Sequence, residues 1–225
     1  MCDVTLQREC PRFCTCTKRP SNLTFAVSCL ARSLSSLPDL LPNPNHPPPR
    51  IGRFQLDFSK SNIRTLDFRD YFGDTAWIDL SKSKIRWIQE KAWKALSQME
   101  HVDLSWNNLT VLPTFLASEN TSFRWLAIYE NPLRCTCDDK WIAGWLRSLG
   151  NRLFTPCYHF AATCHSPYWQ KSKNVLKMTE DDFCTNPSRE RVHLILEVYV
   201  IVRPQSTVGY TSVVASVIHS RQWSN

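Results

Sequence analysis

Ten cysteines are the residues of this 225-residue chain with the most distinctive chemistry. They form two groups, and no cysteine lies between residues 30 and 134. The groups are Cys2, Cys10, Cys14, Cys16 and Cys29, and then Cys135, Cys137, Cys157, Cys164 and Cys184. Zinc sites favour C-x2-4-C pairs, often with a histidine, whereas both groups here contain the tighter C-x-C. Only the second group has nearby histidines, His159 and His165. Disulfides are therefore the favoured interpretation, and they indicate an oxidising compartment.

Two other arrangements suggest catalysis. The cysteines and histidines near residue 160 resemble a Cys–His nucleophile, but a cysteine in a disulfide cannot become a thiolate. Asp138 and Asp139 are adjacent carboxylates that precede an expected amphipathic helix over residues 141–146, where acidic residues usually cap the helix. No phosphate loop, H-E-x-x-H, G-x-S-x-G or EF-hand pattern appears. We therefore predict a non-enzymatic protein with no catalytic residue, no cofactor and no metal.

Four similar segments recur about every two dozen residues. They are residues 56–63, 78–85, 102–109 and 126–133. Their pattern, L-x-L-x-x-N-x-L, is that of leucine-rich repeats, in which each repeat adds one coil to a solenoid. We predict an α/β fold: a short solenoid with a parallel concave sheet of about four to six strands, a cap contribution included. Residues 68–72 and 92–96 are expected to form short helical or irregular turns on the convex side.

One position in each repeat predicts a difference within the solenoid. An asparagine after the strand normally satisfies backbone groups inside the turn. The four repeats hold Ser61, Ser83, Asn107 and Asn131 there. Serine is shorter and has fewer hydrogen-bonding groups. The turns of the first two repeats should therefore be less well fixed than those of the last two.

The segments on either side of the repeats resemble the caps of extracellular leucine-rich repeat proteins. Residues 10–16 read Cys-Pro-Arg-Phe-Cys-Thr-Cys, and residues 131–137 read Asn-Pro-Leu-Arg-Cys-Thr-Cys. The second cap continues to Thr179-Glu-Asp-Asp-Phe-Cys184. The resemblance implies ectodomains of adhesion, growth-factor or guidance receptors, or secreted matrix proteins. Few repeats between two caps occur in neurotrophin-receptor-like and repeat-plus-immunoglobulin proteins.

The resemblance also implies a pairing of eight cysteines. The implied disulfides are Cys10–Cys16, Cys14–Cys29, Cys135–Cys164 and Cys137–Cys184. Cys2 and Cys157 are left over. We expect a leader remnant over residues 1–9, a cap with a proline-rich loop over 10–50, repeats over 51–134, a second cap over 135–184 and a tail over 185–225. The role of the tail is open, although the composition of residues 192–202 and 208–218 predicts strands.

Three glycosylation sequons agree with a secretory route: Asn22, Asn108 and Asn120. The chain begins without the apolar run of a signal peptide, and its longest apolar stretch, residues 192–202, is too short to span a bilayer. We therefore expect an incomplete chain or a misplaced start, an extracellular location, and membrane attachment only through a segment absent from this chain.

The outward strand positions are the best candidates for binding. We predict a partner site at exposed aromatic positions of the strands, as one patch on the concave face centred on Trp106, Trp125 and Tyr129 of the later repeats, because exposed aromatics serve as anchors in protein interfaces. The predicted site residues are Trp77, His101, Trp125, Trp106 and Tyr129. The outward Asp and Ser columns are expected to be solvated, and Lys60, Lys82, Arg64 and Arg86 form a basic strip.

The overall charge limits the classes of partner. The net charge is +7, and no segment has the excess expected of a nucleic-acid binder. We predict a cell-surface adhesion or signalling ectodomain that binds a protein ligand or receptor on its concave face. The alternatives are a matrix protein that binds sulfated glycans and the non-catalytic ectodomain of a receptor kinase.

Overall fold

The computed structural model describes residues 4–5, 10–19, 24–29, 34–42, 53–118, 120–153 and 162–185. The chain divides into two units, Met1–Thr185 and Asn186–Asn225, and the described residues all belong to the first. Cys2, Asn22, Cys157 and both predicted strands of the tail lie outside the described residues.

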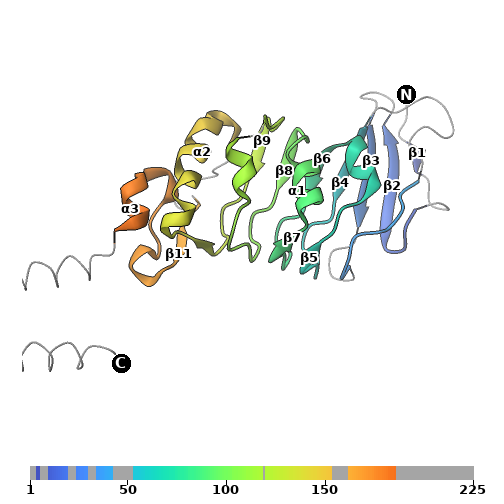
Figure 1. Ribbon diagram of the computed structural model, residues 1–225. Coiled ribbons are helices and arrows are strands. Elements are labelled where there is room, and N and C mark those ends of the chain that lie inside the picture. The colour runs from blue at the N-terminus through green and yellow to red at the C-terminus, as the bar shows by residue number, and fades with distance from the viewer. Residues whose placement is uncertain are drawn as a thin grey trace, which may run out of the picture. The chain divides into compact units, whose positions relative to one another are not determined.

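A seven-stranded sheet runs along one side of the first unit (Figure 1). Its order is β1 (Val4–Thr5), β2 (Cys14–Arg19), β3 (Thr24–Cys29), β4 (Arg53–Asp57), β6 (Thr75–Asp79), β8 (His101–Asp103) and β9 (Trp125–Ala127). The first three strands pair antiparallel. From β3 to β9 every pairing is parallel. The predicted parallel sheet is therefore confirmed, and β3 of the first cap extends it.

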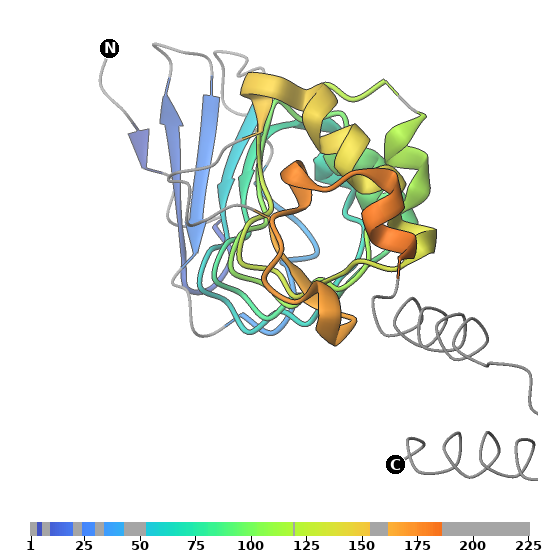
Figure 2. The same ribbon diagram turned by 90° about the vertical axis from the view of Figure 1, so that its left-hand side faces the viewer.

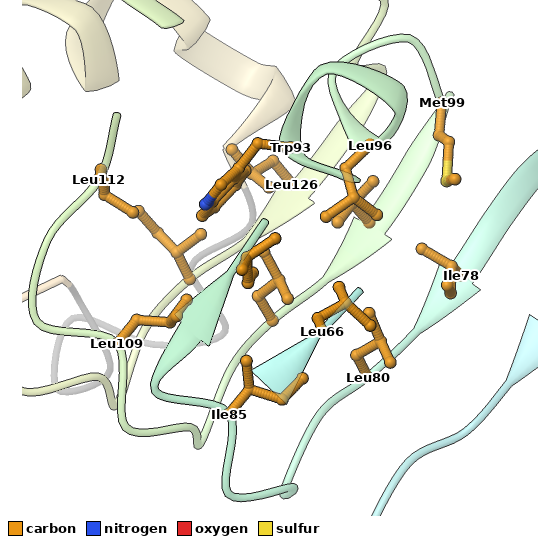
Figure 3. Close-up of a cluster of buried hydrophobic side chains, with 14 of the residues drawn as sticks. Leu66, Ile78, Leu80, Ile85, Trp93, Leu96, Met99, Leu109, Leu112 and Leu126 are labelled. Carbon is orange, nitrogen blue, oxygen red and sulfur yellow. The ribbon is translucent and has the colours of Figure 1, made fainter. Parts of the chain in front are cut away.

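The repeat register follows from the alternation of strand side chains. Leu56, Ile78, Val102 and Leu126 pair in one row across the strands. All four are buried, because successive side chains of a strand point to opposite faces. The column after each turn, Ile63, Ile85, Leu109 and Leu133, is also buried. Figure 3 shows side chains of both sets meeting inside the coils, where they form one continuous core.

The other sides of the coils carry short helical segments and a second sheet. The helical segments are η1 (Asp70–Asp74), α1 (Glu90–Leu96) and η2 (Thr114–Ala117). Each buries a large apolar side chain: Phe72, Trp93 and Leu116. Strands β5 (Thr65–Leu66) and β7 (Trp87–Ile88) form a parallel pair below them. Figure 2 shows helical segments across the coils from the main sheet. Two of them, η1 and α1, correspond to the turns expected over residues 68–72 and 92–96.

The turn asparagines differ from the turn serines as expected. Asn107 Nδ2 donates to the carbonyls of Leu80, Leu104 and Ser105 at 2.9–3.2 Å, and its Oδ1 accepts the Ile85 amide at 3.0 Å. Asn131 makes the equivalent four contacts one coil further on. By contrast, Ser83 Oγ accepts the Ser61 amide at 3.1 Å and donates to the Ser81 carbonyl at 3.5 Å. Fewer bonds therefore hold the earlier turns.

Two disulfides close each end of the solenoid. At the first cap, Cys10–Cys16 and Cys14–Cys29 link the start of the sheet. At the second cap, Cys135–Cys164 and Cys137–Cys184 join segments 29 and 47 residues apart. These are the four pairs that the resemblance implies. Cross-links that close long loops stabilise a fold mainly by restricting the unfolded chain.

The second cap is built around one amphipathic helix, α2 (Trp141–Leu149). The other cap elements are β10 (Leu133–Arg134), η3 (Cys137–Asp139), η4 (Gly150–Arg152), β11 (Cys164–Ser166), η6 (Tyr168–Gln170), η7 (Val175–Lys177) and α3 (Glu180–Cys184). Ile142, Trp145 and Leu146 of α2 are buried, which confirms the predicted helical face. The helix covers the last coil, which would otherwise expose its core.

The predicted capping role of the acidic pair falls on Asp139. Its carboxylate accepts the Thr136 amide at 3.0 Å and both Nε and Nη2 of Arg134, at 2.8 and 3.0 Å. Burial alone would raise the pKa of Asp139, but the bonds from Arg134 and Thr136 outweigh it and lower that pKa. The carboxylate therefore caps η3, whereas α2 begins after Lys140 without a side-chain cap, so the expected capping of that helix is wrong.

Candidate functional site

Three of the predicted residues form one row on the open face of the sheet. Trp77 of β6 pairs with His101 of β8, and His101 pairs with Trp125 of β9. The His101 and Trp125 rings lie 6.4 Å apart, centroid to centroid, at 31°. All three side chains are half-buried. We call Trp77, His101 and Trp125 the aromatic row.

A second row lies two residues further along β6 and β8 and extends to β4. It consists of Asp57, Asp79 and Asp103, which pair directly across β4, β6 and β8. Each carboxylate accepts the amide of the serine two residues later, at 3.1, 2.8 and 2.8 Å. We call these three residues the acidic row. It places three carboxylates beside the aromatic row.

Burial raises the pKa values of Asp79 and Asp103. Hydrogen bonds from Ser81 and Ser105 and the nearby positive charge of Lys82 oppose the rise, while repulsion from the neighbouring row member adds to it. Keeping both carboxylates ionised therefore costs free energy in the unbound protein. A cationic group placed over the row would offset part of that cost.

The opposite border of the aromatic row is also charged. Arg53 Nη1 contacts Glu100 Oε1 at 2.7 Å, and Arg124 Nε lies 3.5 Å from Glu100 Oε2. These residues begin or precede strands β4, β8 and β9. The aromatic row thus lies between an ion-pair network and the acidic row, an arrangement of apolar centre and polar rim that resembles protein interfaces.

The other two predicted residues lie apart from this row. Trp106 and Tyr129 sit at the turn ends of their coils, beyond the acidic row and Ala127. The Trp106 amide donates to the Tyr129 carbonyl at 3.0 Å, so the two residues lie side by side. Trp106 has a φ of 56° and is 43% exposed, whereas Tyr129 is half-buried. The five residues therefore form two groups rather than one patch.

The expectation of solvated serine columns is wrong for two members. Ser81 is 8% exposed and Ser105 is 1% exposed. The turn folds each serine under the aspartate two residues earlier, and Ser105 Oγ donates to Asp103 Oδ1 at 2.6 Å. Simple strand alternation fails here because the strand has already ended.

Comparison with known proteins supports the architecture. No known protein-family model matches the sequence. Chondroadherin of Mus musculus is 25% identical over 116 residues, 52% of this chain, and that of Homo sapiens is 26% identical. The match spans only 29% of chondroadherin. A chain in the Toll–Spatzle complex of Drosophila superposes with a TM-score of 0.67 at 19% identity, over 81% of this chain and 23% of that one. Its glycosylated form gives 0.62 at 21% identity.

The fold is that of a disulfide-capped leucine-rich repeat protein. The repeat register, the two caps and the superposition agree on this point. Its four disulfides indicate an extracellular location, because such cross-links persist in oxidising compartments. No helix among the described residues has the length and apolarity needed to cross a bilayer.

The described part of this leucine-rich repeat chain offers little that resembles a reactive centre. It contains no group of three or more His, Cys, Asp or Glu residues that could hold a metal. Cys164 is bonded to Cys135, which removes the thiol from the Cys–His pair considered above. His165, beside it, is exposed in β11.

Two of the three sequons fall on described residues. Asn108 and Asn120 are both exposed, and each lies in a connection between elements. Asn108 directly follows the turn residue Asn107, so it lies in the turn rather than in a strand of the sheet. Their glycosylation stays a prediction.

Sequence reasoning missed a groove on the flank of the coils. It has a volume of about 710 Å³ and lies between β7 and the segment that leads into η2. Trp87, Trp93 and Phe115 are among the residues that line it. Trp87 is 54% exposed, but a two-residue strand carries too little periodicity for the sequence to reveal that exposure.

Proposed function

We propose that this chain is an extracellular binding module that holds a protein partner across the open face of its sheet. The single observation that supports this most is the aromatic row: Trp77, His101 and Trp125 in direct register on neighbouring strands. Half-buried indoles are fixed in place before binding, so little side-chain entropy is lost when a partner covers them. The chain is accordingly a binding protein rather than an enzyme.

The chemistry of the face favours a particular kind of partner surface. The indoles offer flat apolar area, and aromatic anchors of this kind each contribute about 2 kcal/mol or more to an interface. The acidic row beside them favours a basic side chain from the partner. We therefore expect a protein that presents an apolar contact flanked by Lys or Arg.

The relatives are consistent with this proposal. Toll forms a complex with Spatzle, and this chain shares the fold of a chain in that complex. We propose a comparable role in adhesion or signalling for this chain, either secreted or displayed at a cell surface. The identity of the partner is the finer question that an experiment must answer.

The test uses the chain as an oligomeric probe against an array of purified extracellular proteins and receptor ectodomains. A partner found there is then measured by biolayer interferometry against Trp77→Ala and Trp125→Ala. Each should weaken binding about 30-fold, the equivalent of about 2 kcal/mol. Trp87→Ala is the matched control, because it removes an exposed indole from the flank of the same coils.

Two results would contradict the proposal. One is an equal loss of binding in Trp87→Ala, and the other is full binding by both row variants. A large fall in melting temperature in the row variants would instead make Trp77 and Trp125 structural residues. Circular dichroism melts of all three variants therefore accompany the binding data.

A further inference from the structure

The turns of the first two repeats carry nearly the same five residues. Residues 60–64 read Lys-Ser-Asn-Ile-Arg and residues 82–86 read Lys-Ser-Lys-Ile-Arg. The serine and isoleucine of each turn are buried, and the remaining three positions are exposed. The buried positions thus force the charged ones outward. We call the five cations the basic edge: Lys60, Arg64, Lys82, Lys84 and Arg86.

The two turns are in direct backbone contact. The Lys60 amide donates to the Ser81 carbonyl at 2.7 Å, and the Arg86 amide donates to the Arg64 carbonyl at 3.0 Å. Equivalent residues of stacked coils therefore lie about 5 Å apart, the spacing between neighbouring strands. Lys60 and Lys82 both have a positive φ, 57° and 53°, so the turn holds them in the same orientation.

Ion pairing differs between this edge and four other arginines of the described residues. Those four arginines lie against carboxylates. These pairs are Arg53 and Arg124 with Glu100, Arg69 with Asp39, and Arg134 with Asp139. None of the five cations of the basic edge forms an ion pair with a described residue.

The gathering of charge is local rather than a general excess. Residues 51–134 contain eleven basic and ten acidic residues, so the repeats are close to neutral. Five of those eleven lie in the two turns, and no acidic residue lies there. Like charges brought together in this way repel one another and weaken the fold slightly. An anionic ligand across both turns would relieve that repulsion.

Aromatic surface borders the basic edge on two sides. Trp106 occupies the position of Lys82 on the next coil, and Trp87 follows Arg86 directly. Arg86 and Trp87 also line the groove of about 710 Å³ on the flank. Such a border suits a ligand that combines regularly spaced anionic groups with the apolar ring faces of sugars.

We propose that the basic edge binds a sulfated glycosaminoglycan chain. Arginine guanidinium groups bind sulfate and phosphate oxygens with two parallel hydrogen bonds, and lysines add mobile charge. The disulfides indicate an extracellular chain, where sulfated glycans are the abundant linear polyanions. The site is separate from the aromatic row and does not depend on the proposed protein partner.

The experiment measures binding of the full chain to size-defined heparin oligosaccharides at about 0.15 M salt, by biolayer interferometry. The variant Lys82→Gln with Lys84→Gln removes two charges from the basic edge. Its matched control, Lys171→Gln with Lys173→Gln, removes two exposed lysine charges from the second cap. We expect at least a tenfold rise in Kd for the first pair and less than twofold for the control.

A second variant tests the arginines. Arg64→Lys with Arg86→Lys keeps the charge but removes the two-pronged contact, and we expect a three- to tenfold loss. The slope of log Kd against log salt should fall by about one for each lysine contact removed. Trp77→Ala should bind heparin as the wild type does, which separates this site from the sheet face. Circular dichroism of each variant checks that it is folded.

Several results would overturn the proposal. Equal losses in the control pair would show that net charge alone drives binding. Equal affinity for polyphosphate of the same charge would show a general polyanion effect. If the basic-edge variants lose binding to vesicles with 20% phosphatidylserine but keep heparin binding, the edge is a membrane contact instead. Absence of wild-type heparin binding at about 0.15 M salt contradicts it directly.

Discussion

The first two repeats and the last two share one backbone but differ in the side chains of their turns. Their strands pair in unbroken register, and their inner columns are equally buried. The early turns hold serines under a surface of lysine and arginine. The later turns hold asparagines under Trp106 and Tyr129. The comparison shows that a solenoid can fix its shape with one set of positions and vary its surface with another.

The two halves also differ in how firmly hydrogen bonds fix their turns. Each later asparagine bonds to three carbonyls and one amide, whereas Ser83 makes two bonds. Trp125 belongs to the repeat whose turn Asn131 holds. An aromatic anchor is useful only if it stays in place, while a polyanion tolerates movement of flexible cations. Two of the three residues of the aromatic row, His101 and Trp125, lie in the better-fixed half, and Trp77 lies on the strand next to them.

The largest expected effect is on stability, through the turn side chains. Asn107→Ala leaves buried carbonyls and an amide without a partner, and we expect a loss of about 3 kcal/mol in the free energy of unfolding. Ser83→Ala should cost about 1 kcal/mol because fewer bonds are lost. Urea unfolding monitored by tryptophan fluorescence compares the two. Equal losses would remove the distinction between the halves.

A smaller effect is expected on binding at the turn ends. Tyr129→Ala should weaken binding of the protein partner by about 1 kcal/mol. This loss is smaller than that of Trp125→Ala, because Tyr129 lies outside the aromatic row. Lys82→Gln should leave that affinity unchanged. Isothermal titration of the purified partner measures both. A Tyr129→Ala loss larger than that of Trp125→Ala would move the centre of the site to the turn end.

The smallest effect concerns the acidic row, which crosses the boundary between the halves. Burial raises the folded-state pKa of Asp103, so ionisation of Asp103 opposes folding at neutral pH. Asp103→Asn keeps a side-chain oxygen for the Ser105 amide and should be more stable at pH 7 by less than about 1 kcal/mol. The gain should shrink as the pH falls through the raised pKa, because the wild-type carboxyl becomes neutral. Asp79→Asn should show the same gain in stability and the same dependence on pH.

The sign is opposite for Asp139 in the second cap. Its folded-state pKa is lowered, so its contribution is present above the ordinary value and is lost as the pH falls through the lowered one. Thermal melts of Asp103→Asn and Asp139→Asn between pH 3 and pH 7 should therefore diverge from the wild type in opposite directions at neutral pH. If both variants shift the melting temperature in the same direction at neutral pH, the opposite pKa shifts assigned to Asp103 and Asp139 are contradicted.

The sequence predicts the parts of this molecule that repeat. The period and the alternation of Leu56, Ile78, Val102 and Leu126 predict strands, register and core, because a solenoid allows one way to bury such a pattern. The difference between Ser83 and Asn107 is also evident from the sequence. The pairing of cysteines within each cap has no such rule and depends on resemblance.

The candidate site was harder to predict where regular structure ends. Strand alternation correctly places Trp77, His101 and Trp125 in one row. It fails at Ser105, which the turn folds under Asp103, and it does not separate Trp106 from that row. Turn conformations depend on backbone angles, such as the positive φ of Trp106, that side-chain periodicity does not encode.

The most direct test of the central claim is to place a glycan on the open face of the sheet. His101→Asn with Asp103→Thr creates a sequon in the middle of the aromatic row, and the threonine hydroxyl can still accept the Ser105 amide. Mass spectrometry confirms occupancy, and surface plasmon resonance measures the protein partner and heparin in parallel. We predict that the glycosylated protein loses the protein partner, keeps heparin binding and melts within a few degrees of the wild type. Retention of full protein-partner binding by the occupied form would show that the partner does not use this face.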